Sequence, residues 1–126
     1  MDQRITNLRH ELHALAEPSG GEVKTKAKLK EFLRANTTLE LIDCTGGFYA
    51  AHREAEKLKK SLALRADFDA LALPDGGYAH LCGHDGHSAA LCAVALGLEG
   101  KTFGRDIFLL FQPAEETGEG AKGCLE

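Results

Sequence analysis

The segment HLCGHDGHSA, residues 80–89, carries the densest cluster of groups in this chain that could do chemistry. Three of the six histidines lie here, together with Cys82 and Asp85. Cys82 and His84 are two positions apart, and Gly83 between them would let both side chains turn to one side of a bent loop. Thiolate and imidazole are ligands of zinc and similar divalent metals. The spacing predicts a metal site, and a cysteine nucleophile paired with a histidine is the competing interpretation.

Two pairs of carboxylates complete the candidate set. Asp67 and Asp69 lie in RADFD, and Glu115 and Glu116 are neighbours in PAEE. Because adjacent side chains diverge, we expect one glutamate to bind the metal and the other to handle the proton of a water molecule. That division is the general-base arrangement of metal-assisted hydrolysis, and a cysteine nucleophile would leave the glutamates without a role. For Asp67, solvation at a strand end or pairing with Arg65 is the alternative.

The remaining histidines are less suited to binding a metal. His87 is expected to fill the first turn of a helix, and His80 could either support the site or lie in a plain loop. His10 and His13 are three positions apart and could share a metal, but no cysteine or carboxylate accompanies them at ligand spacing. We therefore favour surface or capping roles for that pair.

The cysteines, at positions 44, 82, 92 and 124, include no CxxC pair. Residues 1–13 lack the apolar core of a secretion signal, which favours a reducing, cytoplasmic compartment and free thiols. Cys92 lies in an apolar helical stretch that predicts a small buried side chain. The same interpretation applies to Cys44 and Cys124, whereas Cys82 is the exception.

Hydrophobic periodicity predicts the elements that position these groups. Two amphipathic helices come first, then a hairpin, then a strand–helix–strand unit that ends at Pro113. In chain order the ranges are 2–16, 22–35, 38–43 with 47–52, 61–71, 85–100 and 105–112. PDGG at residues 74–77 predicts a turn, and Asp85 could cap the helix that follows.

The strand–helix–strand unit predicts where the polar groups meet. Such units build parallel sheets through a right-handed crossover. Asp67 and Asp69 follow the first strand, and the glutamate pair follows the second. The carboxyl ends of parallel strands share one edge of the sheet, so we expect convergence there, beside the loop that carries Cys82 and His84.

Composition narrows the class of protein. The chain has 126 residues, 44% of them hydrophobic and 27% charged, with a net charge of −4, which is typical of one globular domain. No block of lysine or arginine indicates nucleic acid or an anionic membrane as a partner. The longest apolar runs, 89–98 and 107–111, are too short to cross a bilayer.

Three motifs together resemble a known family. LALRADFDAL, HLCGHDGHSAAL and LLFQPAEETGEGAKG resemble the successive signatures of the N-acyl-amino-acid amidohydrolases. That family includes hippurate hydrolases, N-acetyl-diaminopimelate deacetylases and plant auxin-conjugate hydrolases, within the co-catalytic metallopeptidases. The resemblance implies an α/β fold: a three-layer, zinc-exopeptidase-like catalytic domain, here truncated, with a mostly parallel central sheet flanked by helices.

The resemblance also implies residue roles. Cys82 and His84 match metal ligands, with the cysteine placed to reach both of two ions, and Glu116 matches a further ligand. Glu115 matches the catalytic base, and Asp69 matches the carboxylate behind the site that orients a ligand. The implied cofactor is a divalent metal, zinc or manganese, with cobalt or nickel as alternatives. The implied substrate is a small N-acyl amino acid or a dipeptide-like molecule.

The chain departs from the family pattern in two places. The link ALPDGGYAH is shorter than usual, which affects the rim that faces the substrate. In the family that the motifs resemble, two further histidine ligands and a lid or dimerisation domain come from downstream segments, so we expect residues 1–126 to be the N-terminal part of the catalytic domain. The alternative is a non-catalytic fragment that self-associates, as a homo-oligomer, or binds a partner through an unpaired strand edge.

Overall fold

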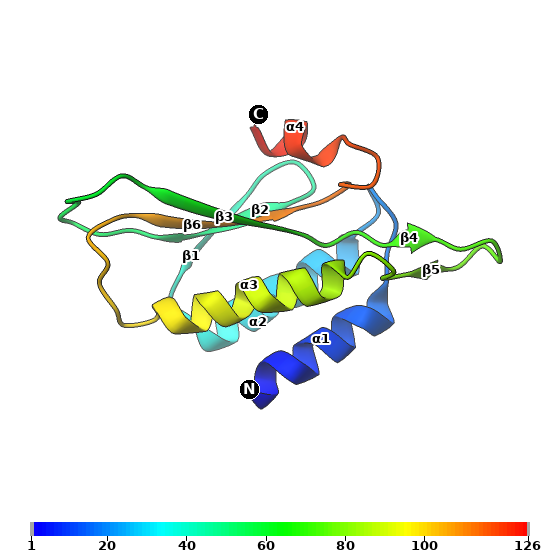
Figure 1. Ribbon diagram of the computed structural model, residues 1–126, viewed down its shortest axis with the longest axis horizontal. Helices are drawn as coiled ribbons and strands as arrows, with labels where there is room; N and C mark the ends of the chain where they lie inside the picture. Colours follow the sequence, from blue (N-terminus) through cyan, green and yellow to red (C-terminus); the bar gives the residue numbers. More distant parts are fainter. Residues whose placement is uncertain (1, 126) are drawn as a thin grey trace.

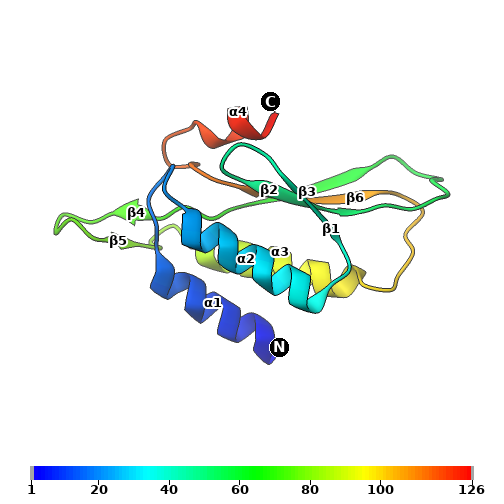
Figure 2. The same cartoon turned by 180° about the vertical axis from the view of Figure 1, so that it is seen from behind.

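The computed structural model describes residues 2–125, and in it a four-stranded sheet lies between helices (Figure 1). Three helices cover one face of the sheet, and a short fourth helix lies on the other side in both views (Figure 2). The helices are α1 (Gln3–Leu15), α2 (Val23–Asn36), α3 (His84–Leu98) and α4 (Gly120–Leu125). This arrangement confirms the α/β class and the predicted helical layers.

The sheet has the strand order β1-β2-β6-β3. Its strands are β1 (Glu40–Asp43), β2 (Phe48–His52), β3 (Leu62–Asp67) and β6 (Ile107–Gln112). Within the described residues only β3 and β6 pair in parallel, whereas β1–β2 and β2–β6 are antiparallel. The sheet in this part of the chain is therefore mixed rather than mostly parallel, because the hairpin adds two strands on the side of β6 away from β3.

The predicted crossover from β3 through α3 to β6 is present, and it fixes the site. In the parallel register Leu62 lies opposite Ile107 and Asp67 opposite Gln112, so both strands end at the same edge. The core lies between this sheet and α1, α2 and α3. The rings of Phe48 and Phe111 stack there at 4.6 Å, and removal of such apolar surface from water is the main stabilising term.

Two local predictions need correction. The strand predicted for 61–71 ends at Asp67, and the chain then forms a small two-stranded sheet, β4 (Leu71–Ala72) with β5 (Tyr78–Ala79), around the predicted PDGG turn. The prediction that Asp85 caps α3 was wrong, because the helix begins at His84 after Gly83, whose φ is +78°.

Asp85 instead ties α3 to α1. Its carboxylate accepts a hydrogen bond from His13 Nδ1 at 2.8 Å and lies 3.2 Å from Arg9 Nε. Burial opposes ionisation of Asp85, yet the hydrogen bond with His13 and the charge of Arg9 lower its pKa. His13 therefore has an interhelical role rather than a shared metal site with His10.

None of the helices in the part of the chain that the structure describes combines the length and the apolar character needed to cross a membrane.

Candidate metal centre

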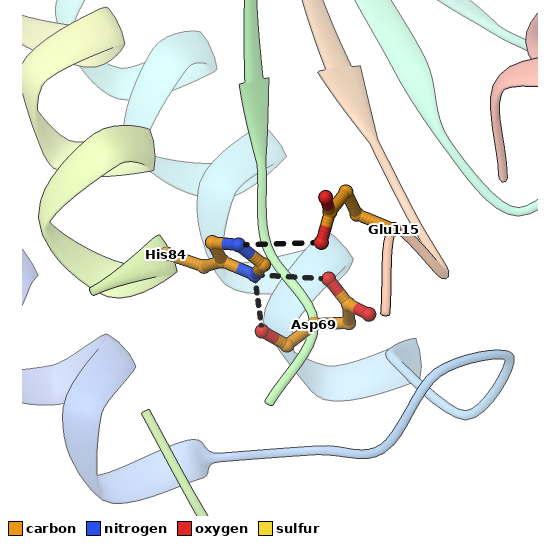
Figure 3. Close-up of side chains that lie close together, drawn as sticks. All are labelled: Asp69, His84 and Glu115. Atoms are coloured by element: carbon orange, nitrogen blue, oxygen red, sulfur yellow. Dashed lines mark hydrogen bonds and ion pairs between the residues drawn. The ribbon is translucent and has the colours of Figure 1, made fainter. Parts of the chain in front are cut away.

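Three segments bring polar side chains together at the predicted edge of the sheet (Figure 3). Asp69 follows β3, His84 opens α3, and Glu115 follows β6. One ligand-capable atom from each of the three lies within 4.8 Å of the other two. Convergence at the carboxyl ends of β3 and β6, predicted from the order of the elements, is thus what the fold produces.

The imidazole of His84 is held in one orientation. Its Nδ1 lies 2.9 Å from the backbone carbonyl oxygen of Asp69 and 3.0 Å from Asp69 Oδ1. These acceptors favour the tautomer that carries its proton on Nδ1. Nε2 then presents its lone pair toward the glutamates, 3.7 Å from Glu115 Oε2 and 3.7 Å from Glu116 Oε1. This is the orientation that a metal-binding histidine requires.

Asp69 forms the buried base of the site, and its carboxylate is inaccessible to solvent. Its Oδ2 accepts hydrogen bonds from Ser19 Oγ at 2.6 Å and from the backbone N–H of Glu116 at 2.9 Å. Asp69 therefore links the loop after α1 to the loop that carries the glutamates. Sequence reasoning gave Ser19 no role, because it lies 50 positions before Asp69 and no local pattern connects the two.

The Cys82 thiol lies beside the second glutamate. It is exposed, and its hydrogen bond with the Glu116 carboxylate, together with partial desolvation and nearby carboxylates, raises the pKa of the thiol. A catalytic cysteine needs the opposite environment, with cationic neighbours that lower its pKa. The surroundings of Cys82 therefore disfavour the cysteine-nucleophile interpretation.

A buried carboxylate supports the loop that carries Glu115. Ala114, which precedes it, has a φ of +51°, a strained value for a residue with a side chain. The backbone N–H of Ala114 donates to Glu22 at 2.6 Å. Glu22 is only 4% exposed, and burial raises its pKa. Sequence reasoning gave Glu22 no role.

The other sequence candidates lie outside the cluster. Asp67 is 2.9 Å from Arg65 Nη1, so the pairing considered as the alternative is the one observed. His87 is exposed in the first turn of α3, as expected. His80 is buried, and neither ring nitrogen has a hydrogen-bond partner among the described residues. Burial lowers the pKa of His80, which favours its neutral form.

The donor set and its spacing fit a divalent cation. Two ligand atoms about 2.1 Å from one zinc ion in tetrahedral geometry lie about 3.4 Å apart. The distances of 3.7 Å from His84 Nε2 to each glutamate are close to that value. A divalent cation would also balance the negative charge of the carboxylates that surround His84 Nε2.

Comparison with known proteins adds an independent observation. Residues 63–126, half of the chain, match the model of peptidase family M20/M25/M40. This chain belongs to that family. The N-acetyl-L-cysteine deacetylase of Bacillus subtilis (strain 168) is 35% identical over 149 aligned residues, which cover 100% of this chain and 33% of the deacetylase. Hippurate hydrolase of Campylobacter jejuni is 35% identical over 94% of this chain and 34% of its own length.

The crystal structure of a related protein has the same fold as this M20/M25/M40 chain. The crystal structure of the Bacillus subtilis YXEP protein, described as a dinuclear metal-binding peptidase of the M20 family, superposes with a TM-score of 0.87 at 33% identity. The match covers 98% of this chain and 38% of that structure. The resemblance to amidohydrolases is confirmed at the level of the family, and the chain spans about a third of the length of the curated relatives named above.

Proposed function

We propose that this chain is the N-terminal part of the catalytic domain of a metal-dependent amidohydrolase that cleaves the amide of N-acyl amino acids. The observation that supports this proposal most directly is the orientation of His84. Its Nδ1 is held by Asp69, and its Nε2 lies 3.7 Å from each of the two glutamates. The relatives support the substrate class, since they include deacetylases of N-acetylated amino acids and a hippurate hydrolase.

The proposed ligands are His84, Glu116 and Cys82. Glu116 shares a hydrogen bond with the thiol, and its side chain is 23% exposed. The Glu115 side chain is 40% exposed, so it is the freer of the two to meet water and substrate. Zinc or manganese is the proposed ion, with cobalt or nickel as alternatives, and a second ion would need ligands beyond those described here.

The chemistry then divides between the ion and the protein. A bound divalent ion supplies Lewis-acid polarisation and makes a water molecule more acidic. Glu115 accepts the proton of the attacking water and returns it to the nitrogen of the departing amine, which is the general acid–base role of a carboxylate. Asp69 keeps His84 in the required tautomer and orientation.

A pair of isosteric variants tests this division. Glu115→Gln should retain metal and lose about 10²- to 10⁴-fold in kcat, whereas Glu116→Gln should lose the metal itself. Metal content is measured by mass spectrometry of the purified chain, and hydrolysis of hippurate and N-acetyl amino acids by product release. Where the reading frame continues downstream, the same variants are made in the longer protein. Glu54→Gln is the matched control outside the site and should change neither quantity.

Three results would count against the proposal. Absence of stoichiometric metal in the unsubstituted protein, after reconstitution with zinc and with manganese, would remove its basis. Loss of metal in Glu115→Gln with retention in Glu116→Gln would reverse the two glutamate roles. Inactivation by thiol alkylation with no effect of chelators would support the cysteine nucleophile instead.

One observation favours a second candidate, a non-catalytic module that self-associates. Among the described strands β3 pairs only with β6, and it presents Leu62 and Leu64 at 40% and 36% exposure. An unpaired apolar edge is a template for association. If association is the function, the sedimentation coefficient should rise with concentration and Leu64→Lys should restore the monomer. A monomer at every concentration would exclude it.

A further inference from the structure

Two cysteines from distant parts of the chain meet away from the metal centre. Cys44 lies in the turn between β1 and β2, and Cys124 lies in α4, 80 positions later. The Cys44 thiol donates a hydrogen bond to the Cys124 sulfur, with 3.1 Å between the two Sγ atoms. Both side chains are partly exposed rather than buried, which differs from the small buried role that the sequence predicted for them.

Close backbone packing brings the two thiols together. The turn is closed by reciprocal hydrogen bonds, Cys44 N to Gly47 O at 3.0 Å and Gly47 N to Cys44 O at 3.2 Å. A Cβ placed on Gly47 would lie 3.3 Å from Cys124 Sγ, and one on Gly123 would lie 3.1 Å from Thr45 Cβ. α4 therefore sits directly on the hairpin turn, and glycines make this approach possible.

We propose that Cys44 and Cys124 are a reversible redox pair, oxidised to a disulfide by exchange with a low-molecular-weight disulfide such as glutathione disulfide. The two sulfurs need to approach by about 1 Å to reach the bonded distance. Such a movement is small for two partly exposed side chains, one of which lies in a short helix.

The exchange balances in two steps. The Cys44 thiolate attacks one sulfur of glutathione disulfide, which forms a mixed disulfide and releases one glutathione. The Cys124 thiolate then attacks the Cys44 sulfur, which forms the internal bond and releases the second glutathione. The protein loses two electrons and two protons, and the oxidant gains both. Burial and the adjacent thiol raise the pKa of Cys124, and the exchange balances equally with either thiol as the first nucleophile.

The bond would act on the loop that carries the proposed catalytic glutamate. That loop joins β6 to α4 and begins at Pro113, and a Cβ on Gly46 of the hairpin turn would lie 3.2 Å from Pro113 Cγ. A Cys44–Cys124 disulfide would fasten α4 to the same turn. Both ends of the loop would then be held by the hairpin, which links the redox state to the position of Glu115.

The test maps the bond chemically. The reduced chain is incubated with glutathione disulfide, remaining thiols are alkylated, and the product is digested with trypsin without reduction. We expect residues 35–53 to be joined to the peptide that begins at Gly123, with a loss of two hydrogen atoms. Dithiothreitol should restore the separate peptides. Cys92 supplies an internal reference, because burial raises its pKa to about 12 and it should stay unmodified in the folded chain.

Variants separate this pairing from other thiol chemistry. Cys44→Ser and Cys124→Ser should each abolish the cross-linked peptide and stop at a glutathione adduct or at no reaction. Cys82→Ser should leave the cross-link unchanged. The proposal is overturned if the unsubstituted chain gives only glutathione adducts, gives a cross-link that includes Cys82, or remains fully reduced under conditions that oxidise a dithiol of ordinary potential.

Discussion

Two clusters of carboxylates lie at opposite ends of β6, and they are built for different purposes. At the amino end, Glu54 and Asp106 accept hydrogen bonds from backbone N–H groups of the loops next to the strand. At the carboxyl end, Glu115 and Glu116 face His84 across the candidate metal centre. All four side chains are carboxylates, so the difference lies in what each carboxylate contacts.

At the amino end the protein itself satisfies the oxygens. Glu54 accepts hydrogen bonds from the backbone N–H groups of Phe103 and Gly104 at 2.7 and 2.8 Å, and from His52 Nε2 at 2.7 Å. Asp106 accepts from the N–H of Glu54 at 2.8 Å. The hydrogen bond with His52, and then those with the amides, lower the pKa of Glu54. These carboxylates stabilise a loop.

At the carboxyl end no backbone amide of the described residues donates to the side chain of Glu115 or Glu116. The Glu115 side chain is 40% exposed, and its Oε2 lies 3.7 Å from His84 Nε2, beyond hydrogen-bond distance. Glu116 contacts the Cys82 thiol and the same nitrogen. A carboxylate that accepts no backbone amide is available to a cation, whereas one that accepts several is not.

The largest expected difference between the two clusters is the response to metal. Zinc at 100 times its Kd should stabilise the folded chain by about 2.7 kcal/mol, measured as a shift of the unfolding midpoint in urea. His84→Ala should remove that shift, because the central ligand is lost. Glu54→Gln should lower the midpoint with and without zinc and keep the shift. An equal zinc response in His84→Ala would mean that the cation binds elsewhere.

A smaller effect should come from the hydroxyl that supports Asp69. Ser19→Ala removes its 2.6 Å hydrogen bond, and loss of a group that orients a ligand typically weakens metal binding about 10- to 100-fold. Competition with a fluorescent chelator measures the Kd. Thr38→Val is the matched control, since Thr38 donates to Glu99 outside the site. If both variants bind zinc like the unsubstituted chain, the Ser19 hydroxyl does not help to position Asp69.

The smallest effect should be a pH dependence confined to the amino-end cluster. The pKa of Glu54 is lower in the folded chain than its unfolded value of about 4.3. The Glu54 carboxylate therefore stabilises the folded state at pH values above about 4.3. The contribution is lost as pH falls through the lower folded value. The free energy of unfolding of the unsubstituted chain should therefore exceed that of Glu54→Gln near pH 5.5.

Urea unfolding of both proteins at two pH values measures this effect. The difference in the free energy of unfolding should be smaller near pH 3 than near pH 5.5, because protonation makes the two side chains alike. A difference that stays constant between these pH values would show that the hydrogen bonds of Glu54, rather than its charge, carry its contribution.

Local sequence features predicted much of the fold and the composition of the site. Apolar periodicity located α1, α2, α3 and the four strands of the main sheet, since burial of one face is a local pattern. The order strand–helix–strand placed the acidic groups at one edge. The interval CGH, with its glycine at a φ of +78°, brought Cys82 and His84 to that edge, next to Glu115 and Glu116.

Tertiary structure alone decided which side chains hold those groups in place. Ser19 reaches Asp69 across 50 positions, and Glu22 reaches Ala114 across 92. The contact between Cys44 and Cys124 spans 80 positions. Pairs at such separations leave no periodic trace, because each depends on how packed elements set their loops side by side. Sequence pattern specified the chemical groups and the edge where they meet, whereas the packing of helices on the sheet set their orientation.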